Sequence, residues 1–320
     1  MTRRTLLQSA LARPGLPFQR GVNFTAEAPA FYGSDAASAM LRQLPAYGVD
    51  AIALVPYGMA RPGTPEVRFN PSRSWERDTG IQRLAAEAHE LGIRVLLKPQ
   101  VWVPRSFPGG LRFDEPHELA AWFSSYQAYI EHYARLAKTI AADLFCVGTE
   151  FVLLSRHATQ WRRIIGRVRA LYPGPLVYAA NFGPEFEQLP FWDAVDYIGL
   201  NNYYPLPGDL SYAEVVGRVE AVHRAARRPV IFTEAGFASL ADAHQQPWDE
   251  SPRALSMQHQ ARCYEALLQA FYNRSWLHGI YFWKVGSNGF GGPADGSHTP
   301  WRKPAMEAVK RWYRSSRRRP

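Results

Sequence analysis

Two glutamates stand at the ends of short apolar runs and are the first candidates for chemistry. Glu150 closes the run 147–150 (VGTE), and Glu234 lies within 231–236 (IFTEAG). A carboxyl group in such a place is costly to bury unless it is hydrogen-bonded or neutralised. A pair of carboxyls without metal ligands suits glycoside hydrolysis, in which one protonates the leaving oxygen and the other attacks the anomeric carbon or activates water. Helix-capping or salt-bridging glutamates are the structural alternative.

Amide and aromatic side chains accompany the two glutamates at the ends of other apolar runs. The chain contains 10 Trp, 16 Tyr and 17 Phe, enough to supply the flat apolar surfaces on which sugars stack. These further candidates are Asn23, Gln100, Trp102, Asn181, Asn201, Asn202, Tyr203, Tyr204 and Trp283. Together with the carboxyls, they favour a carbohydrate as the substrate.

Eight apolar, β-prone runs recur along the chain, and each is followed by an amphipathic helical pattern or, after the fifth, by a short segment interrupted by proline. The runs are 21–24, 51–55, 94–99, 144–148, 176–180, 197–200, 230–232 and 279–283, and the longer helices are expected over 34–47, 78–91, 116–141, 158–171, 212–226, 255–271 and 304–313. This alternation predicts an α/β fold, a single-domain (β/α)8 barrel over residues 20–313, with its active site at the carboxyl ends of the strands. The alternative, an open doubly wound sheet, lacks its usual glycine-rich turn after the first run.

Six fragments in consistent order resemble glycoside hydrolase family 113, whose characterised members include β-mannanases. The fragments are 21–24 (GVNF), 98–102 (KPQVW), 148–150 (GTE), 198–206 (IGLNNYYPL), 233–236 (TEAG) and 279–283 (GIYFW). The family belongs to a clan of retaining barrels with catalytic glutamates on strands four and seven. The resemblance therefore implies Glu150 as general acid/base and Glu234 as nucleophile. The implied double displacement requires carboxyls about 5–5.5 Å apart.

The resemblance also implies roles for the surrounding residues. Tyr203 corresponds to the strand-six tyrosine that hydrogen-bonds the nucleophile, and Trp283 to the platform under the sugar at the cleaved bond. The residues expected to contact sugar hydroxyls or to stack on sugars are Asn23, Gln100, Trp102, Asn181 and Asn202. Three positions depart from the usual pattern: Thr149 where the clan has Asn, Gln100 where His is expected, and Lys284 after Trp283. These departures bear on the substrate more than on the reaction.

The formal net charge of +9 comes from the two ends of the chain. Residues 1–20 carry four Arg and no acid, whereas residues 301–320 carry eight basic residues and one acid, which leaves a net charge of −2 for 21–300. Residues 314–320 therefore read as a basic, solvated tail, and we expect no nucleic acid as a partner. We also expect no membrane span, because the apolar stretches are too short to cross a bilayer. We expect the protein to be a monomer.

The first 19 residues form a basic segment whose opening, MTRRTLLQSALA, resembles a degenerate twin-arginine export signal. A disordered basic terminus explains the same residues, so the sequence leaves periplasmic, secreted and cytoplasmic locations open. Two cysteines, Cys146 and Cys263, cannot form a disulfide framework, and the nine histidines form no metal-site motif. We therefore expect no metal and no other cofactor.

Two other functions remain open from the sequence. A non-catalytic carbohydrate-binding barrel would keep the fold without turnover, although retention of both glutamates argues against it. A barrel hydrolase for another bond, with a metal assisting, lacks a cluster of ligands. These residues determine neither which sugar is bound nor whether the chain is cleaved internally or at its end. Both depend on the long segments 56–77, 103–115, 235–253 and 284–301.

Overall fold

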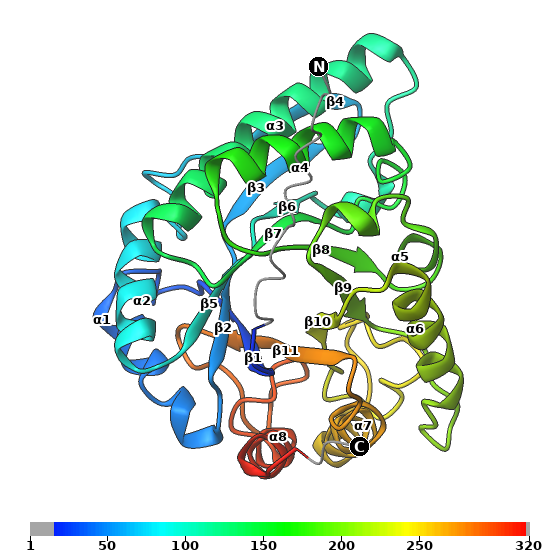
Figure 1. Ribbon diagram of the computed structural model, residues 1–320. Coiled ribbons are helices and arrows are strands. Elements are labelled where there is room, and N and C mark those ends of the chain that lie inside the picture. Colours follow the sequence, from blue (N-terminus) through cyan, green and yellow to red (C-terminus); the bar gives the residue numbers. More distant parts are fainter. Residues whose placement is uncertain (1–15, 318–320) are drawn as a thin grey trace, which may run out of the picture.

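The computed structural model describes residues 16–317, and within them a closed parallel barrel forms the centre of the molecule (Figure 1). Its hydrogen-bonded order is β1-β11-β10-β9-β8-β7-β5-β2. The strands are β1 (Gln19–Thr25), β2 (Ala51–Leu54), β5 (Arg94–Leu97), β7 (Leu144–Thr149), β8 (Leu176–Asn181), β9 (Tyr197–Asn202), β10 (Val230–Ala235) and β11 (Leu277–Gly286). The predicted single-domain (β/α)8 barrel is confirmed.

Helices surround the barrel and cover its outer face (Figure 1). They are α1 (Asp35–Leu41), α2 (Asp78–Glu90), α3 (Pro116–Thr139), α4 (Ala158–Leu171), α5 (Pro184–Gln188), α6 (Ala213–Ala226), α7 (Met257–Phe271) and α8 (Pro304–Arg314), with the 3-10 turns η1 (Leu44–Tyr47), η2 (Pro108–Gly110) and η3 (Trp192–Ala194). The helix expected over 34–47 is divided, since α1 ends at Leu41 and η1 begins at Leu44 with Pro45 in its first turn. Proline cannot donate the hydrogen bond that would continue the helix.

The strands read as continuous apolar runs because both of their faces are buried. Ala51 and Ala53 point into the barrel, whereas Ile52 and Leu54 pack under the helices. The interior accepts mostly small or branched side chains, namely Ala51, Ala53, Val55, Leu96, Leu144, Cys146, Val177, Ala179 and Ile231, closed by Tyr197 and Tyr281. The barrel is therefore packed throughout, and only the carboxyl ends of its strands can hold a ligand.

A small second sheet lies in the segment that the sequence predicted as a long loop. It has the order β4-β3-β6, where β3 (Tyr57–Arg61) and β4 (Thr64–Arg68) form an antiparallel hairpin and β6 (Gln100–Trp102) pairs in parallel with β3. Gly63 occupies the hairpin turn at φ 71°, a conformation that favours glycine. The hairpin extends the barrel wall above β2 and β5 and places Trp102 at its edge.

Arg317, the last described residue, is bound to the body of the protein through its side chain. The Arg317 guanidinium donates to the carbonyl oxygens of Tyr272 (2.7 Å) and Arg274 (2.8 Å) and lies 3.8 Å from the centroid of the Phe18 ring. This contact joins the two ends of the described chain. The export-signal segment up to residue 15, and residues 318–320, lie outside the described part.

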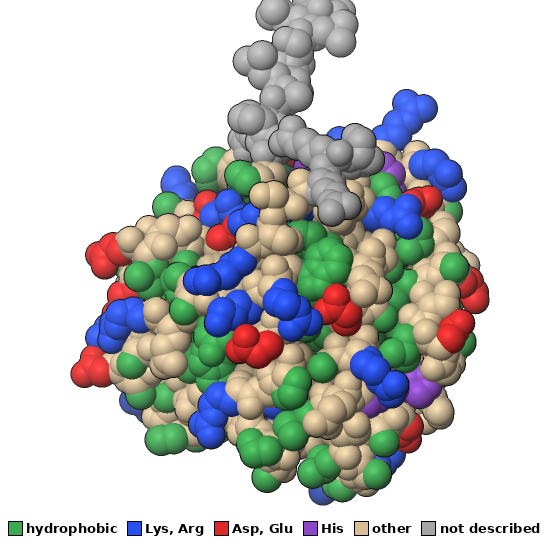
Figure 2. Space-filling model, turned by 90° about the horizontal axis from the view of Figure 1, so that it is seen from below, with side chains coloured by type: hydrophobic (Ala, Val, Ile, Leu, Met, Phe, Trp, Pro, Cys, Tyr) green, Lys and Arg blue, Asp and Glu red, His purple; other side chains and the backbone are tan. Residues whose placement is uncertain are grey.

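Basic and acidic side chains alternate on the face that α7 and α8 present. Figure 2, which views the molecule from below, shows them interspersed and gathered into no single basic patch. Arg311 pairs with Glu265 (3.1 Å), and Arg274 pairs with Glu220 (3.2 Å). Among the described residues, no helix is long and apolar enough to cross a membrane.

We predict that Arg317→Ala lowers the free energy of unfolding by about 1 to 2 kcal/mol, because it removes charged hydrogen bonds and a cation–π contact from a half-buried site. Thermal unfolding measures the change. Arg314→Ala, at the exposed end of α8, is the matched control and should change stability by less than about 0.5 kcal/mol. Equal effects of the two substitutions would contradict the structural role of Arg317.

Candidate active site

Both candidate glutamates open onto one cleft of about 830 Å³ at the carboxyl ends of the barrel strands. Glu150 follows β7 directly, and Glu234 is the fifth residue of β10. The cleft is lined by Gln100, Arg105, Ser106, Phe107, Glu150, Asn181, Phe182, Tyr203, Glu234, Trp248, Asp249, Glu250, Trp283 and His298. Six of the nine residues predicted for catalysis or substrate binding thus line one cleft: the two glutamates, Gln100, Asn181, Tyr203 and Trp283.

Glu234 is buried and surrounded by hydrogen-bond donors. One carboxylate oxygen accepts from Lys98 Nζ and from Gln100 Nε2 (2.7 Å), and the other accepts from the Tyr203 hydroxyl (2.9 Å). Burial first, and then the negative charge of Glu234, raise the pKa of Tyr203 well above its usual value, so this hydroxyl keeps its proton. Three donors on two oxygens suit an ionised carboxylate, which can only accept hydrogen bonds.

Lys98 supplies the positive charge beside Glu234 and was not among the residues predicted for the site. Its side chain is fully buried, and besides Glu234 it donates to Asn23 Oδ1 (3.1 Å) and contacts the Thr233 carbonyl (3.4 Å). A lone lysine at the end of the apolar run 94–97 is itself a signal, because a buried ammonium group requires a partner. That signal could have identified it.

Glu150 has a different environment. Its backbone adopts φ 56°, a left-handed conformation that is uncommon outside glycine, and its carboxyl accepts a hydrogen bond from Asn201 Nδ2 (3.0 Å). The Asn201 amide is oriented in turn by the Thr233 hydroxyl, which donates to Asn201 Oδ1 (2.8 Å). Burial, and then the charge of Glu234, raise the pKa of Glu150 to about 8, against a smaller opposing effect of the Asn201 hydrogen bond.

A second set of hydrogen bonds holds the chain on the far side of Glu150. The backbone N–H of Phe151 donates to the Tyr178 hydroxyl (3.2 Å), and that hydroxyl donates to Glu185 (2.7 Å). The other oxygen of Glu185 accepts from the backbone N–H of Asn181 (2.7 Å). The uncommon backbone conformation at Glu150 is therefore fixed from both β7 and β8.

Three of the residues expected to contact the sugar do not line the cleft. Asn23 is fully buried, and its amide donates to the carbonyls of Thr233 (3.1 Å) and Tyr281 (3.2 Å) while it accepts from Lys98, so it supports the lysine. Asn202 is buried as well and has no hydrogen-bond partner for its amide among the described residues. Successive side chains of a strand point to opposite faces, which gives the neighbour Asn201, and not Asn202, the contact with Glu150.

The third of these residues, Trp102, lies in a neighbouring hollow. It is 53% exposed and lines a space of about 880 Å³ beside the cleft, together with Tyr57, Trp75, Glu76 and Lys284. Lys284 forms an ion pair with Glu27 there (2.7 Å) and lies 5.7 Å from the centroid of the Trp283 ring. The hollow and the cleft therefore meet at Trp283 and Lys284.

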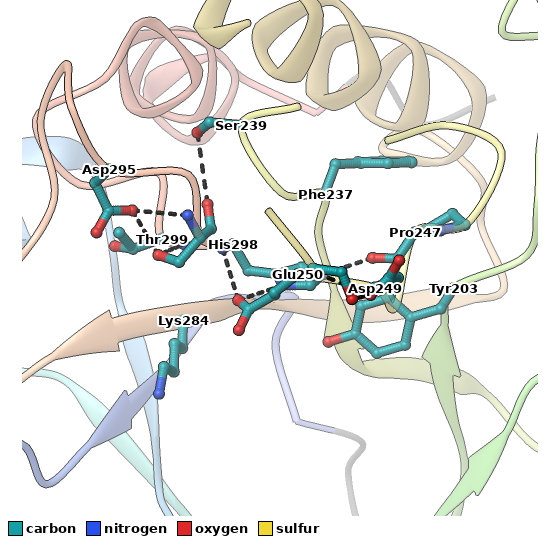
Figure 3. Close-up of polar contacts among 12 residues, drawn as sticks. Tyr203, Phe237, Ser239, Pro247, Asp249, Glu250, Lys284, Asp295, His298 and Thr299 are labelled. Carbon is teal, nitrogen blue, oxygen red and sulfur yellow. Dashed lines mark hydrogen bonds and ion pairs between the residues drawn. The ribbon is translucent and has the colours of Figure 1, made fainter. Parts of the chain in front are cut away.

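The opposite wall of the cleft comes from the loop between β10 and α7. Figure 3 shows His298 between Glu250 and the carbonyl of Pro247, with Tyr203 beside it. Burial alone would raise the pKa of Glu250, but the hydrogen bond and the charge of His298 lower it to about 2. Sequence reasoning missed both residues, because a histidine and a glutamate in two separate loops carry no pattern.

No group of three or more His, Cys, Asp or Glu side chains among residues 16–317 is arranged to hold a metal ion. Within the cleft, Lys98 pairs with Glu234 and His298 pairs with Glu250. The carboxyls of Glu234 and Glu150 have opposite surroundings, because Glu234 is held by a lysine, an amide and a hydroxyl, whereas Glu150 has a raised pKa.

The family model for Glycoside Hydrolase Family 113 matches residues 23–290. The chain belongs to glycoside hydrolase family 113. Among solved structures it is similar to the family 113 β-mannanase AaManA from Alicyclobacillus acidocaldarius, in complex with ManMIm, with 34% identity over 93% of this chain and 97% of the other, at a TM-score of 0.86. A second family 113 β-1,4-mannanase is 26% identical over 94% of this chain and 100% of the other, also at a TM-score of 0.86.

Two further comparisons complete this family assignment. A family 2 β-galacturonidase from Eisenbergiella tayi is 13% identical at a TM-score of 0.62, which reflects the barrel fold alone. No curated protein sequence matches the chain at a significant level. The family 113 match and its β-mannanase structures establish this protein as a glycoside hydrolase.

We predict that Glu150→Gln gains stability relative to the parent protein as the pH rises from 5 to 8. The folded protein retains the Glu150 proton up to about pH 8, whereas the unfolded chain releases it near pH 4.3. In that window the parent's free energy of unfolding therefore falls with pH. The glutamine variant lacks this loss, and the difference should reach about 2 kcal/mol at pH 8, allowing for the part of the carboxyl that faces solvent.

Chemical denaturation at pH 5, 6.5 and 8 measures this difference. Glu90→Gln, at the exposed end of α2, is the control and should show the same offset at each pH. A constant offset for Glu150→Gln as well would show that the carboxyl titrates in the folded protein much as it does in the unfolded chain.

Proposed function

We propose that this glycoside hydrolase cleaves β-linked, mannan-type oligo- or polysaccharides by double displacement, with Glu234 as nucleophile and Glu150 as general acid/base. The contrast between the two carboxyls is the observation that supports this proposal most strongly. Glu234 accepts hydrogen bonds from three donors, one of them a buried ammonium group, whereas burial and the Glu234 charge raise the pKa of Glu150 to about 8. A retaining enzyme needs one ionised and one protonated carboxyl at the start.

In the first step, an oxygen of Glu234 bonds to the anomeric carbon and the glycosidic bond breaks. The electron pair of that bond goes to the leaving oxygen, which takes the proton from Glu150. Glu234 is then an ester and no longer charged, so its repulsion of the Glu150 carboxylate ends. In the second step, Glu150 accepts a proton from water, the water oxygen bonds to the anomeric carbon, and Glu234 leaves as a carboxylate.

Lys98, Gln100 and Tyr203 stabilise the charge of Glu234 before attack and after release. Asn201 holds Glu150 in place, and Trp283 offers an aromatic surface beside the nucleophile, 5.4 Å from Lys98 Nζ to its ring centroid. We assign Trp283 and Asn181 to contact with the sugar. Asn23, which does not line the cleft, acts through Lys98.

The mannan-type substrate rests on the similar structures, which are named as β-mannanases and of which one is 34% identical over nearly the full length of both chains. The hollow beside Trp283 and the aromatic residues on the opposite wall offer room for sugar units on both sides of the cleaved bond. Binding of mannan-type oligosaccharides without any turnover would instead favour the carbohydrate-binding barrel.

We predict opposite products from azide rescue of two alanine variants. Glu234→Ala should lose at least about 10³-fold in kcat. With added azide and an activated aryl β-mannoside, it should form the glycosyl azide of inverted configuration, because azide replaces the missing nucleophile. Glu150→Ala should instead give the azide of retained configuration, because azide attacks the intact glycosyl-enzyme.

Proton NMR of the isolated azides distinguishes the two configurations. Inverted azide from Glu150→Ala would exchange the two roles, and sugar released with inverted configuration by the parent enzyme would contradict double displacement. Glu131→Ala, which removes a buried carboxyl of α3 outside the cleft, serves as a control that should show no azide product.

We further predict that kcat/KM on a β-mannan oligosaccharide declines above about pH 8, because Glu150 must be protonated to act as the acid. With a 2,4-dinitrophenyl glycoside the leaving group needs no proton, so the alkaline decline should disappear from kcat/KM. Initial rates between pH 4 and 10 on both substrates test this. The same alkaline decline with both substrates would show that another group limits the rate.

A further inference from the structure

Two aromatic rings stack on one wall of the catalytic cleft. The ring centroids of Phe182 and Trp248 are 5.2 Å apart with an interplanar angle of 23°, and both residues line the same cleft as Glu150 and Glu234. Trp248 is 47% exposed. A large exposed aromatic side chain at the mouth of a cleft provides a flat apolar surface on which a sugar ring can lie.

The stacked pair lies on the leaving-group side of the cleft. A general acid has to reach the oxygen of the bond that breaks, so the leaving group departs along the side of Glu150. Phe182 follows β8, the barrel neighbour of β7, from which Glu150 comes. Trp283 and Lys284 lie on β11, next to β10 and Glu234, and border the other hollow.

His298 holds the segment that carries Trp248. Its Nδ1 lies 2.5 Å from a carboxylate oxygen of Glu250, and its Nε2 lies 2.5 Å from the carbonyl oxygen of Pro247. Both partners accept hydrogen bonds, so both ring nitrogens carry a proton and the ring is a cation. The same oxygen of Glu250 also accepts from the His298 backbone N–H (2.8 Å).

These contacts hold the chain on both sides of Trp248. Pro247 precedes it and Glu250 follows two residues later, and both are bound to one buried side chain (Figure 3). Asp249, between them, is paired with Arg253, whose guanidinium also pairs with Asp242 (3.0 Å). The His298 ring packs edge-on against Tyr203, with 5.8 Å between centroids, so the wall is joined to a donor of Glu234.

We propose that Trp248, stacked on Phe182, is the platform for the sugar on the leaving-group side, and that His298 is the positioning residue that holds it there. The occupant is the first or second sugar unit beyond the cleaved bond of a β-linked oligosaccharide. This inference rests on the proposed retaining hydrolysis. It makes the enzyme selective for substrates whose leaving group is itself a sugar chain.

The test compares two substrates that share a glycone and differ in the leaving group: β-1,4-mannopentaose and β-mannobiosyl fluoride. Fluoride has no surface to stack, so only the oligosaccharide uses the platform. For Trp248→Ala, the ratio of the two kcat/KM values, pentaose over fluoride, should fall about tenfold relative to the parent enzyme. Trp248→Phe should restore most of the ratio.

Trp75→Ala is the matched control, because it removes a tryptophan of similar exposure (50%) from the hollow on the other side. Both substrates carry the glycone, so this variant should leave the ratio within about twofold of the parent value. A ratio that falls equally in Trp75→Ala would overturn the assignment of sides. An unchanged ratio in Trp248→Ala would overturn the platform.

The positioning role of His298 has its own readout. His298→Gln keeps a donor but loses the cation and one of the two hydrogen bonds, and it should lower the same ratio. In the double variant with Trp248→Ala, the ratio should fall no further than in Trp248→Ala alone, because both changes act through one side chain. Additive falls would assign His298 a separate effect and overturn its role in holding Trp248.

If the proposed function is wrong, the same assays give a different result from the one that overturns the platform. If the parent enzyme cleaves the corresponding cellopentaose and β-cellobiosyl fluoride but neither manno-substrate, the sugar assignment is wrong and the same ratio is read on the gluco pair. If it cleaves neither pair, hydrolysis of these β-linked chains is contradicted, and the platform with it. An unchanged ratio in an active enzyme overturns the platform alone.

Discussion

A positive charge buried beneath a carboxylate is the constraint on which the rest of this site depends. Lys98 follows β5 directly, has no exposed surface, and contacts Asn23 of β1 together with Glu234 and the Thr233 carbonyl of β10. An ammonium group in such a place is stable only if every one of these partners is in position. Closure of the barrel between β1, β5 and β10 therefore determines whether the lysine can be accommodated, and the lysine in turn determines the charge of Glu234.

The negative charge of Glu234 also determines whether Glu150 keeps its proton. Two carboxyls that open onto one cleft cannot both ionise without cost, and three donors, one of them an ammonium group, bind Glu234. Glu150 receives a single amide hydrogen bond, from Asn201, and is left with the proton. The Thr233 hydroxyl orients Asn201 while the Thr233 carbonyl contacts Lys98, so one residue of β10 connects the two environments.

Much of the fold could be predicted from the sequence because buried parallel strands give continuous apolar runs that stand out between helical patterns. The hairpin of β3 and β4 was missed, since its two strands are half exposed, five residues long and polar at several positions. Glu150 and Glu234 were found because a carboxyl after an apolar run has few structural explanations. The roles of Asn23 and Asn202 could not be predicted, because they depend on which way a side chain points.

Strand pairing is irregular next to the two glutamates. The register shifts between Cys146 and Thr149 where β7 meets β8, and between Phe232 and Glu234 where β10 meets β9. Each shift places an extra residue in β7 or β10 and changes the alternation of side chains there by one residue, so alternation along these two strands does not predict which side chain enters the cleft. Bulges of this kind re-aim side chains, and here they lie immediately before the two glutamates.

The barrel strands and the loops have different roles in the cleft. Every side chain that hydrogen-bonds to Glu150 or Glu234 lies on a barrel strand or within three residues of the end of one, as Gln100 of β6 does after β5, so regular sheet structure holds it in place. The walls on either side come from longer connections, the hairpin near Trp102 and the loop that carries Trp248. Loops can exchange side chains without disturbing the Lys98 environment. Substrate choice can therefore change while the chemistry stays the same.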